Sequence, residues 1–310
     1  MRRQYVARLS VAAIMIIIGC SAEDPSPGPT TGVPSSSAMD SNSSPSAAST
    51  PADPPARSES AGPSPTAAKR PDPERQAGLD QQLRDAAWHN DVGTAQRLIK
   101  AGADVNAKDE TEQSAYLVAT SEGYLRLLQL TLNNGADVGS LDSWKGTGLI
   151  RAAERGHGFV VGELLQAGIA RDHVNRIGYQ AIHEAVWLGE DTDEYLTTLR
   201  VLAAGGARLS DRSVNEGLTP LEMARQRGHQ RQQQVLTRLT EDTAPNNPDH
   251  ALLAAARDGD ADAVALALRA GADLETRDAG DRTALLLATA DDHVAAADVL
   301  VAMGTRPAGS

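Results

Sequence analysis

The sequence predicts an all-α repeat solenoid, a stack of about seven helix-turn-helix units with finger loops, over residues 79–310. Two observations support this fold class. Gly102 and Gly135 begin near-identical Gly-Ala-Asp segments 33 residues apart, and Gly271 and Gly304 are separated by the same interval. An Ala also recurs once in every unit at a matching place. Self-similarity at a fixed period of about 20–50 residues is typical of stacked repeats.

Each unit can be numbered from a zero position, so that equivalent positions can be compared between units. The zero positions of units one to seven are Gln81, Ser114, Thr147, Gln180, Thr219, His250 and Thr283. Position 5 is then always Ala, position 2 is always a large apolar residue, and position 9 is Gly in five of the seven units. Chance does not produce so regular a pattern.

The residues of one unit predict two short helices. Ser or Thr at the zero position can cap the first helix with its hydroxyl, and Pro220 stands where a helix tolerates a missing N–H. The Ala at position 5 lets neighbouring helices approach closely. The Gly at position 9 can adopt the left-handed conformation that ends a helix. A second helix with apolar pairs such as Leu98-Ile99 follows, and the next Gly opens a polar loop.

This pattern resembles the ankyrin repeat. The family motif Thr-Pro-Leu-His-x-Ala-Ala is matched by residues 219–221 and by residues 182–185, and Gly-Ala-Asp-Val-Asn is matched by residues 102–106. The resemblance covers about residues 79–306. It implies antiparallel helix pairs with hairpin-like fingers at one side, a first-helix surface and finger tips that bind proteins, and a hydrogen bond from His183 between loops.

Two places depart from the regular period. Unit four carries about five or six extra residues within 188–196, and unit five lacks its Gly-Ala-Asp loop and continues into a Pro- and Asn-rich stretch at 240–250. We expect the stack to bend or loosen at the second place and to be weakest there.

The N-terminus has the features of a bacterial lipoprotein signal over residues 1–19. Three arginines precede an apolar run, Val11–Ile18, which is too short to span a bilayer. Gly19-Cys20 follows and resembles a lipobox, in which the cysteine thiol is acylated. Cys20 is the one cysteine of the chain, so no internal disulfide can form. We expect lipidation at Cys20; the alternative is an ordinary secretory signal with an incidental cysteine.

Residues 20–78 predict a disordered tether. The segment after Cys20 is dominated by Ser, Pro, Ala, Thr and Gly and has no run of large apolar residues, so it cannot bury enough surface to offset its chain entropy. As a random coil it would reach roughly 40–45 Å. The predicted location is therefore the outer side of a cell membrane, with a lipid anchor. Arg outnumbers Lys by 25 to 4, which favours a bacterial host with high-GC coding.

Charge and motif content exclude several classes of function. The net charge of −12 falls to −15 when the three arginines of residues 1–19 are removed, and no basic stripe is present to bind nucleic acid. The histidines at position 10 lie a repeat or more apart and are interpreted as structural. Residues 258–262 imitate a calcium loop but lack its later Gly and Glu, and the acidic insert near Glu190 is interpreted as a solvated loop. We expect no catalytic residue, no metal, no cofactor and no small-molecule substrate.

Aromatic residues point to a protein partner, although they are only 3% of the chain. Trp88 and Trp187 both occupy position 7, and Trp144 and Tyr179 lie on predicted fingers. Exposed Trp and Tyr are enriched in binding hot spots. The alternative is that Trp88 covers the open end of unit one and Trp187 packs on the unit-four insert. The charged residues expected to form a mixed rim around this surface are Arg151, Glu154, Arg155, Glu184 and Arg212.

Three function hypotheses follow. The leading one is a membrane-anchored, extracytoplasmic ankyrin-repeat lipoprotein that acts as a protein–protein interaction module with an unknown partner. The second is a structural or protective accessory of an exported envelope enzyme. The third, an enzyme or metal protein, has the weakest support from the residues.

Overall fold

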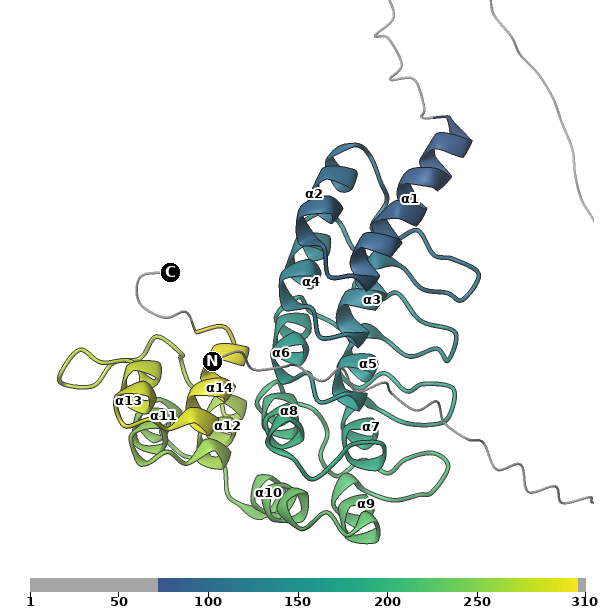
Figure 1. Cartoon of the computed structure of the whole chain (residues 1–310). Coiled ribbons are helices and arrows are strands. Elements are labelled where there is room, and N and C mark those ends of the chain that lie inside the picture. The colour runs from purple at the N-terminus through teal and green to yellow at the C-terminus, as the bar shows by residue number, and fades with distance from the viewer. Residues whose placement is uncertain (1–71, 306–310) are drawn as a thin grey trace, which may run out of the picture. The chain divides into compact units, whose positions relative to one another are not determined.

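A computed structural model describes residues 72–305, which form 14 helices with two isolated β-bridges and no longer strand (Figure 1). The predicted signal, Cys20 and the tether up to residue 71 lie outside the described residues. Units one to four contain the helix pairs α1 (Pro73–Trp88) and α2 (Val92–Lys100), α3 (Ala115–Ser121) and α4 (Leu125–Leu132), α5 (Gly148–Glu154) and α6 (Gly158–Gln166), and α7 (Ala181–Trp187) and α8 (Asp193–Ala204). Units five to seven contain α9 (Pro220–Arg227) and α10 (Gln230–Glu241), α11 (Pro248–Asp258) and α12 (Ala261–Arg269), and α13 (Ala284–Ala290) and α14 (Val294–Ala302). The predicted fold class is confirmed.

Local capping begins and ends these helices as the pattern predicts. The hydroxyls of Ser114, Thr147, Thr219 and Thr283 each accept a hydrogen bond from the backbone N–H three residues later. At Thr219 the Glu222 carboxylate also accepts from the Thr219 N–H at 2.8 Å, which completes a capping box. Gly228 ends α9 at a φ of 72°, in the left-handed region that favours glycine.

The first helix begins earlier than the sequence suggested. The repeat domain was expected to start at Leu79, whereas α1 starts at Pro73 with Asp72 as its N-cap. The side chain of Gln76 donates to the Gly102 carbonyl at 2.9 Å. The last residues assigned to the tether are therefore helical, because Asp72-Pro73 supplies a helix start and Gln76 reaches the loop after α2.

Units one to five form one stack of two helix layers (Figure 1). The first helices, from α1 to α9, pack on one another in order, and each second helix packs on its own partner. The loops between units project as fingers on the first-helix side. Adjacent fingers are joined by backbone hydrogen bonds, as between Arg176 N and Trp144 O at 2.9 Å and between Val214 N and Gly178 O at 3.0 Å.

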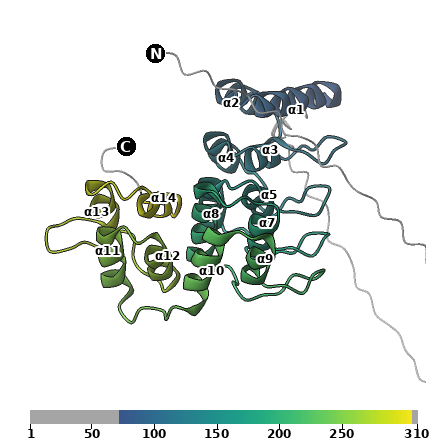
Figure 2. The ribbon, with the colours of Figure 1, turned by 60° about the horizontal axis from the view of Figure 1, so that its bottom comes forward.

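The last two units do not continue this stack. After α10 ends at Glu241, the chain turns. Helices α11–α14 then lie against the second-helix layer, on the side away from the first helices (Figures 1 and 2). Helix α12 packs on α8 and α10, and α14 packs on α6 and α8. The sequence suggested a bend or a loose joint in one stack of seven. The structure instead has two stacks, of five and of two units, packed back to back.

Charged side chains hold the two stacks together. Asp262 on α12 pairs with Arg200 on α8 at 2.6 Å and with Arg238 on α10 at 3.1 Å. The Arg200–Asp262 pair is nearly buried, with 13% and 8% of the two side chains exposed. Arg269 adds hydrogen bonds to the carbonyls of Ala203 and Ala207 at 2.9 and 2.8 Å. Paired and hydrogen-bonded charges of this kind fix one orientation between the stacks.

The backbones of α14 and α6 also lie close together where the two stacks meet. A Cβ built on Gly162 would lie 1.9 Å from the carbonyl oxygen of Ala302. The side chain of Gln166 also donates to that carbonyl at 3.0 Å. Only glycine at position 162 allows the two helices to meet in this way.

The end of the five-unit stack is polar, which explains why no unit follows it. Positions 3, 11, 14 and 18 of a unit face the unit that follows: His183 at position 3 bonds the Asp211 carbonyl, and Leu165 at position 18 lies against Gly205. Positions 11, 14 and 18 are apolar or small in units one, two, three and six. In unit five the four positions hold Glu222, Gln230, Gln233 and Thr237. A polar outer face is what a terminal repeat needs in water.

Candidate interaction surface

Exposed apolar side chains gather on the fingers and at the ends of the first helices. Among the residues that the structure describes, nine large apolar side chains are exposed, and five of them lie on this side: Trp88, Trp144, Val174, Leu188 and Val214. Trp88 and Leu188 lie at the ends of α1 and α7, and the other three lie on the fingers before units three, four and five. Large exposed apolar side chains that recur along one side of a stack are typical of a protein-binding surface.

Trp144 is held on its finger by the backbone beneath it. The Asp142 carboxylate accepts from the backbone N–H groups of Trp144 and Gly146 at 2.9 and 2.8 Å, which fixes the finger turn. The guanidinium of Arg176 lies 5.9 Å from the centre of the Trp144 ring. The ring is nevertheless 46% exposed. Trp144 is therefore an ordered aromatic side chain that a partner can reach.

Tyr179 is not available to a partner, so the expectation that it is an exposed finger residue is wrong. It is only 3% exposed. Its ring stacks on His183 at 6.2 Å and lies 6.4 Å from the ring of Trp187. Burial, together with the nearby Glu216, raises the pKa of Tyr179. The residue just before the zero position turns into the stack here, and its burial is set by the neighbouring rings.

The two remaining tryptophans differ in accessibility. Trp88, the last residue of α1, is 45% exposed. Trp187 is partly buried, and besides Tyr179 its ring meets the guanidinium of Arg227 at 5.7 Å. Trp187 is thus only partly accessible, whereas Trp88 and Trp144 each expose nearly half of their surface. Binding by any of the three stays a prediction.

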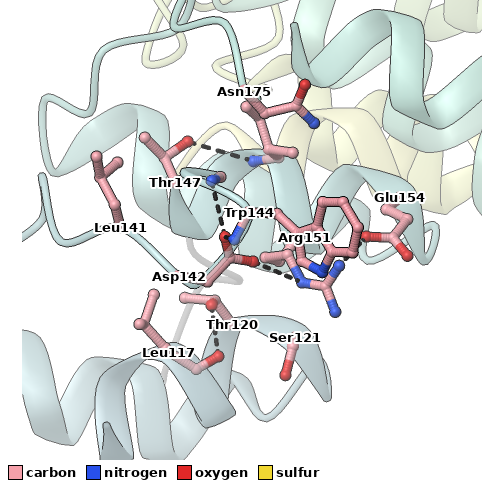
Figure 3. A network of polar contacts seen from close by, with 12 residues as sticks. Leu117, Thr120, Ser121, Leu141, Asp142, Trp144, Thr147, Arg151, Glu154 and Asn175 are labelled. Carbon is pink, nitrogen blue, oxygen red and sulfur yellow. Dashed lines mark hydrogen bonds and ion pairs between the residues drawn. The ribbon is translucent and has the colours of Figure 1, made fainter. Parts of the chain in front are cut away.

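Arg151 and Arg155 are occupied by ion pairs within the stack. Arg151 lies between Asp142, at 3.4 Å from its Nε, and Glu154 (Figure 3). Arg155 in unit three pairs with Glu122 in unit two at 2.5 Å. These contacts join neighbouring units and a finger, so both arginines stabilise the surface even before a partner binds. Their predicted role in partner binding stays a prediction.

Glu184 lies beneath this surface rather than on its rim, which corrects the sequence-based expectation. It is 3% exposed, and one carboxylate oxygen accepts from Asn175 Nδ2 at 2.6 Å. The other oxygen, Oε2, is buried without a hydrogen-bond partner. Burial raises the pKa of Glu184 to about 7, with Glu154 acting in the same direction, while the Asn175 hydrogen bond and Arg151 oppose the shift. Position 4 faces the preceding unit, which the residue type alone does not reveal.

Sequence reasoning missed Val174, Leu188 and Val214. Val174 and Val214 lie in fingers and Leu188 caps α7, and each is exposed. The sequence did contain a sign that these three residues are unusual. A β-branched residue in a polar loop and a Leu at the variable position 8 both depart from the repeat pattern.

Three of the histidines make structural hydrogen bonds to backbone carbonyls, as predicted. His183 Nε2 meets the Asp211 carbonyl at 3.1 Å, His157 Nε2 meets the Ser121 carbonyl at 3.1 Å, and His293 Nε2 meets the Arg257 carbonyl at 3.0 Å. Within residues 72–305, no group of three or more His, Cys, Asp or Glu side chains is arranged to hold a metal ion. The same range has no helix long and apolar enough to cross a bilayer.

Known proteins show the same repeat. A family profile described as ankyrin repeats (3 copies) matches residues 115–212. The ankyrin repeat protein YahD of Escherichia coli strain K12 is 32% identical over 154 residues, which cover 49% of this chain and 75% of YahD. The chain belongs to the ankyrin-repeat family. Human ankyrin repeat domain-containing protein 63 is 32% identical over 121 residues, 37% of this chain and 32% of that protein.

A solved structure is also similar. The crystal structure of an ankyrin repeat domain from Acinetobacter baumannii is 41% identical, covers 51% of this chain and 80% of that chain, and superposes with a TM-score of 0.48. Ankyrin repeats suggest a protein–protein interaction module and are typically non-enzymatic. The exposed fingers and first-helix ends are therefore the candidate site of this ankyrin-repeat chain.

Proposed function

We propose that this ankyrin-repeat protein is anchored to the outer face of a cell membrane by a lipid on Cys20 and binds a protein partner through its fingers. The observation that supports partner binding is the set of five exposed apolar side chains on the fingers and first-helix ends of the five-unit stack, with Trp144 held in place by the Asp142 turn. Ordered aromatic side chains lose little entropy on binding and contribute strongly to affinity.

The anchor is supported by the order of segments in the sequence. A basic start, a short apolar run and Gly19-Cys20 precede a Ser- and Pro-rich stretch. Two or three acyl chains hold a protein stably at a membrane, where one chain does not. Labelling with a radioactive fatty acid tests this step. The label is expected on the wild type and absent from Cys20→Ser; equal labelling of both would refute the anchor.

Crosslinking in intact cells followed by affinity capture tests the binding surface. The variant Trp88→Ala plus Trp144→Ala removes two ordered, exposed rings and is expected to lose the crosslinked species of the wild type. Phe159→Ala is the matched control for crosslinks to a different protein, since Phe159 is also exposed but lies on the second-helix layer, away from the fingers. Equal crosslinking by the double variant would exclude the finger side. A stoichiometric exported enzyme in the captured material would favour the accessory role over a general interaction module.

A further inference from the structure

The two stacks end in faces of opposite chemistry. Unit five presents polar residues at positions 3, 11, 14 and 18, whereas unit seven has Leu286, Val294, Ala297 and Val301 at the same four positions. Leu286, Val294 and Val301 are 40%, 67% and 36% exposed. In units one, two, three and six, each of which has a following unit, positions 11, 14 and 18 are apolar or small. Unit seven therefore has the residues of a covered unit but no cover within residues 72–305.

A groove of mixed polar and apolar lining extends this face toward the five-unit stack. Val301 lines this groove, of about 250 Å³, together with Leu125 on α4 and Phe159 on α6, and the polar side chains of Gln129, Glu163 and Gln166 line its other walls. Ala302, which packs against Gly162, lines the same groove. The end face is thus continuous with the interface between the two stacks. Phe159, Leu286, Val294 and Val301 are the four exposed large apolar side chains that do not belong to the finger side.

We propose that the end face of unit seven pairs with the same face of a second copy of this chain, around a two-fold axis. None of its four side chains is charged, so two copies of a chain with net charge −12 meet there without like charges in the centre of the contact. A two-fold contact uses one patch on both copies and closes after two subunits.

Head-to-tail stacking of copies does not fit as well. Position 1 of a unit faces the preceding unit, as Gly148 shows by its closeness to Thr120 and Tyr116. In unit one, positions 1 and 4 are Gln82 and Asp85, both exposed. The front of the five-unit stack is polar, so it offers no apolar match for unit seven. The best match on the described surface is unit seven of another copy.

The size of the face sets the strength of the contact. Helices of 7 and 9 residues lying side by side give a face of about 14 by 20 Å. A stable interface buries about 800 Å² on each partner, so the groove beside Phe159 has to contribute and the dimer is expected to be weak. Two-dimensional confinement by the proposed lipid anchor would raise its population at a membrane, although the pairing itself does not depend on the anchor.

Analytical ultracentrifugation of the full chain in mild detergent tests the proposal. From about 1 to 200 µM the wild type is expected to shift from monomer toward dimer. The variant Leu286→Glu, Val294→Gln and Val301→Thr copies the residues of unit five at three of the four positions. It is expected to weaken self-association at least about tenfold while keeping the helical circular dichroism. Val214→Gln, at a finger residue that is 73% exposed, is the control and should dimerise normally.

A charge-pair experiment distinguishes self-pairing from any other use of the face. Val294→Glu and Val294→Lys should each be monomeric, because each places like charges together in the dimer. Mixing the two variants should restore a dimer. A wild type that stays monomeric throughout, a triple variant that dimerises normally, or mixed variants that stay monomeric would each overturn self-pairing, and would leave a repeat of another protein as the occupant. Loss of crosslinks in the Trp88 and Trp144 variant is independent of all these outcomes.

Discussion

Replacing Glu184 by glutamine is expected to change how the stability of the five-unit stack depends on pH. Glu184 is buried, its Oε2 has no hydrogen-bond partner, and its pKa rises from 4.5 to about 7 in the folded state. The folded protein therefore holds a proton that the unfolded chain releases. The stabilisation is fully present below pH 4.5, falls as the pH rises toward 7, and is absent above that pH.

The magnitude follows from the two pKa values. A pKa difference between 4.5 and about 7 corresponds to about 3 kcal/mol of unfolding free energy lost by the wild type between low and high pH. Glutamine can still accept from Asn175 Nδ2 through its carbonyl oxygen. Its amide nitrogen is left without an acceptor, which costs about 1 kcal/mol. Glu184→Gln should therefore be more stable than the wild type by about 2 kcal/mol at pH 8 and less stable at pH 4.5.

Urea unfolding followed by tryptophan fluorescence measures this difference, because Trp144 and Trp187 report on the units around Glu184. His157 and His183 also titrate in this window: burial lowers the pKa of each, so they add stability as the pH rises. Their contribution cancels in the difference between variant and wild type at each pH. Glu275→Gln, at an exposed site, controls for the loss of one negative charge. A difference that is the same at pH 5 and pH 8 would refute the reasoning.

Three further predictions concern the packing of the stacks and the helix caps. Gly162→Ala should push α14 from α6 and cost about 1–3 kcal/mol, seen as faster amide exchange in α14; the control Gly78→Ala, whose Cβ has open space in α1, should stabilise by about 0.5–1 kcal/mol. Asp262→Ala leaves the nearly buried Arg200 without its acid, while Arg238 keeps Asp260 at 2.8 Å, and should destabilise the contact between stacks by about 3 kcal/mol; unchanged protease cleavage in the linker at residues 242–247 would contradict this. Thr219→Ala removes a capping-box hydroxyl and should lower stability by about 1 kcal/mol in thermal unfolding, with a wild-type melting curve as the outcome against it.

Much of the candidate site could be located from the sequence, but not its accessibility. The repeat register places Trp88 and Trp187 at the end of a first helix and Trp144 on a finger, and the structure agrees with these places. The same register cannot tell that Tyr179 and Glu184 are buried. Both depend on contacts from neighbouring units and fingers, such as the Asn175 side chain over Glu184, and these contacts follow from how the units rotate against each other.

The sequence by itself determined the period, the helix caps, the structural histidines and the number of units. These features depend on residues within one unit or in adjacent units, so the chain pattern carries them directly. Only the tertiary structure decided that units six and seven turn back on the five-unit stack. That packing depends on pairs far apart in the chain: Arg200 with Asp262, 62 residues apart, and Gln166 with Ala302, 136 residues apart. No local periodicity encodes such contacts, and they leave the apolar end of unit seven exposed.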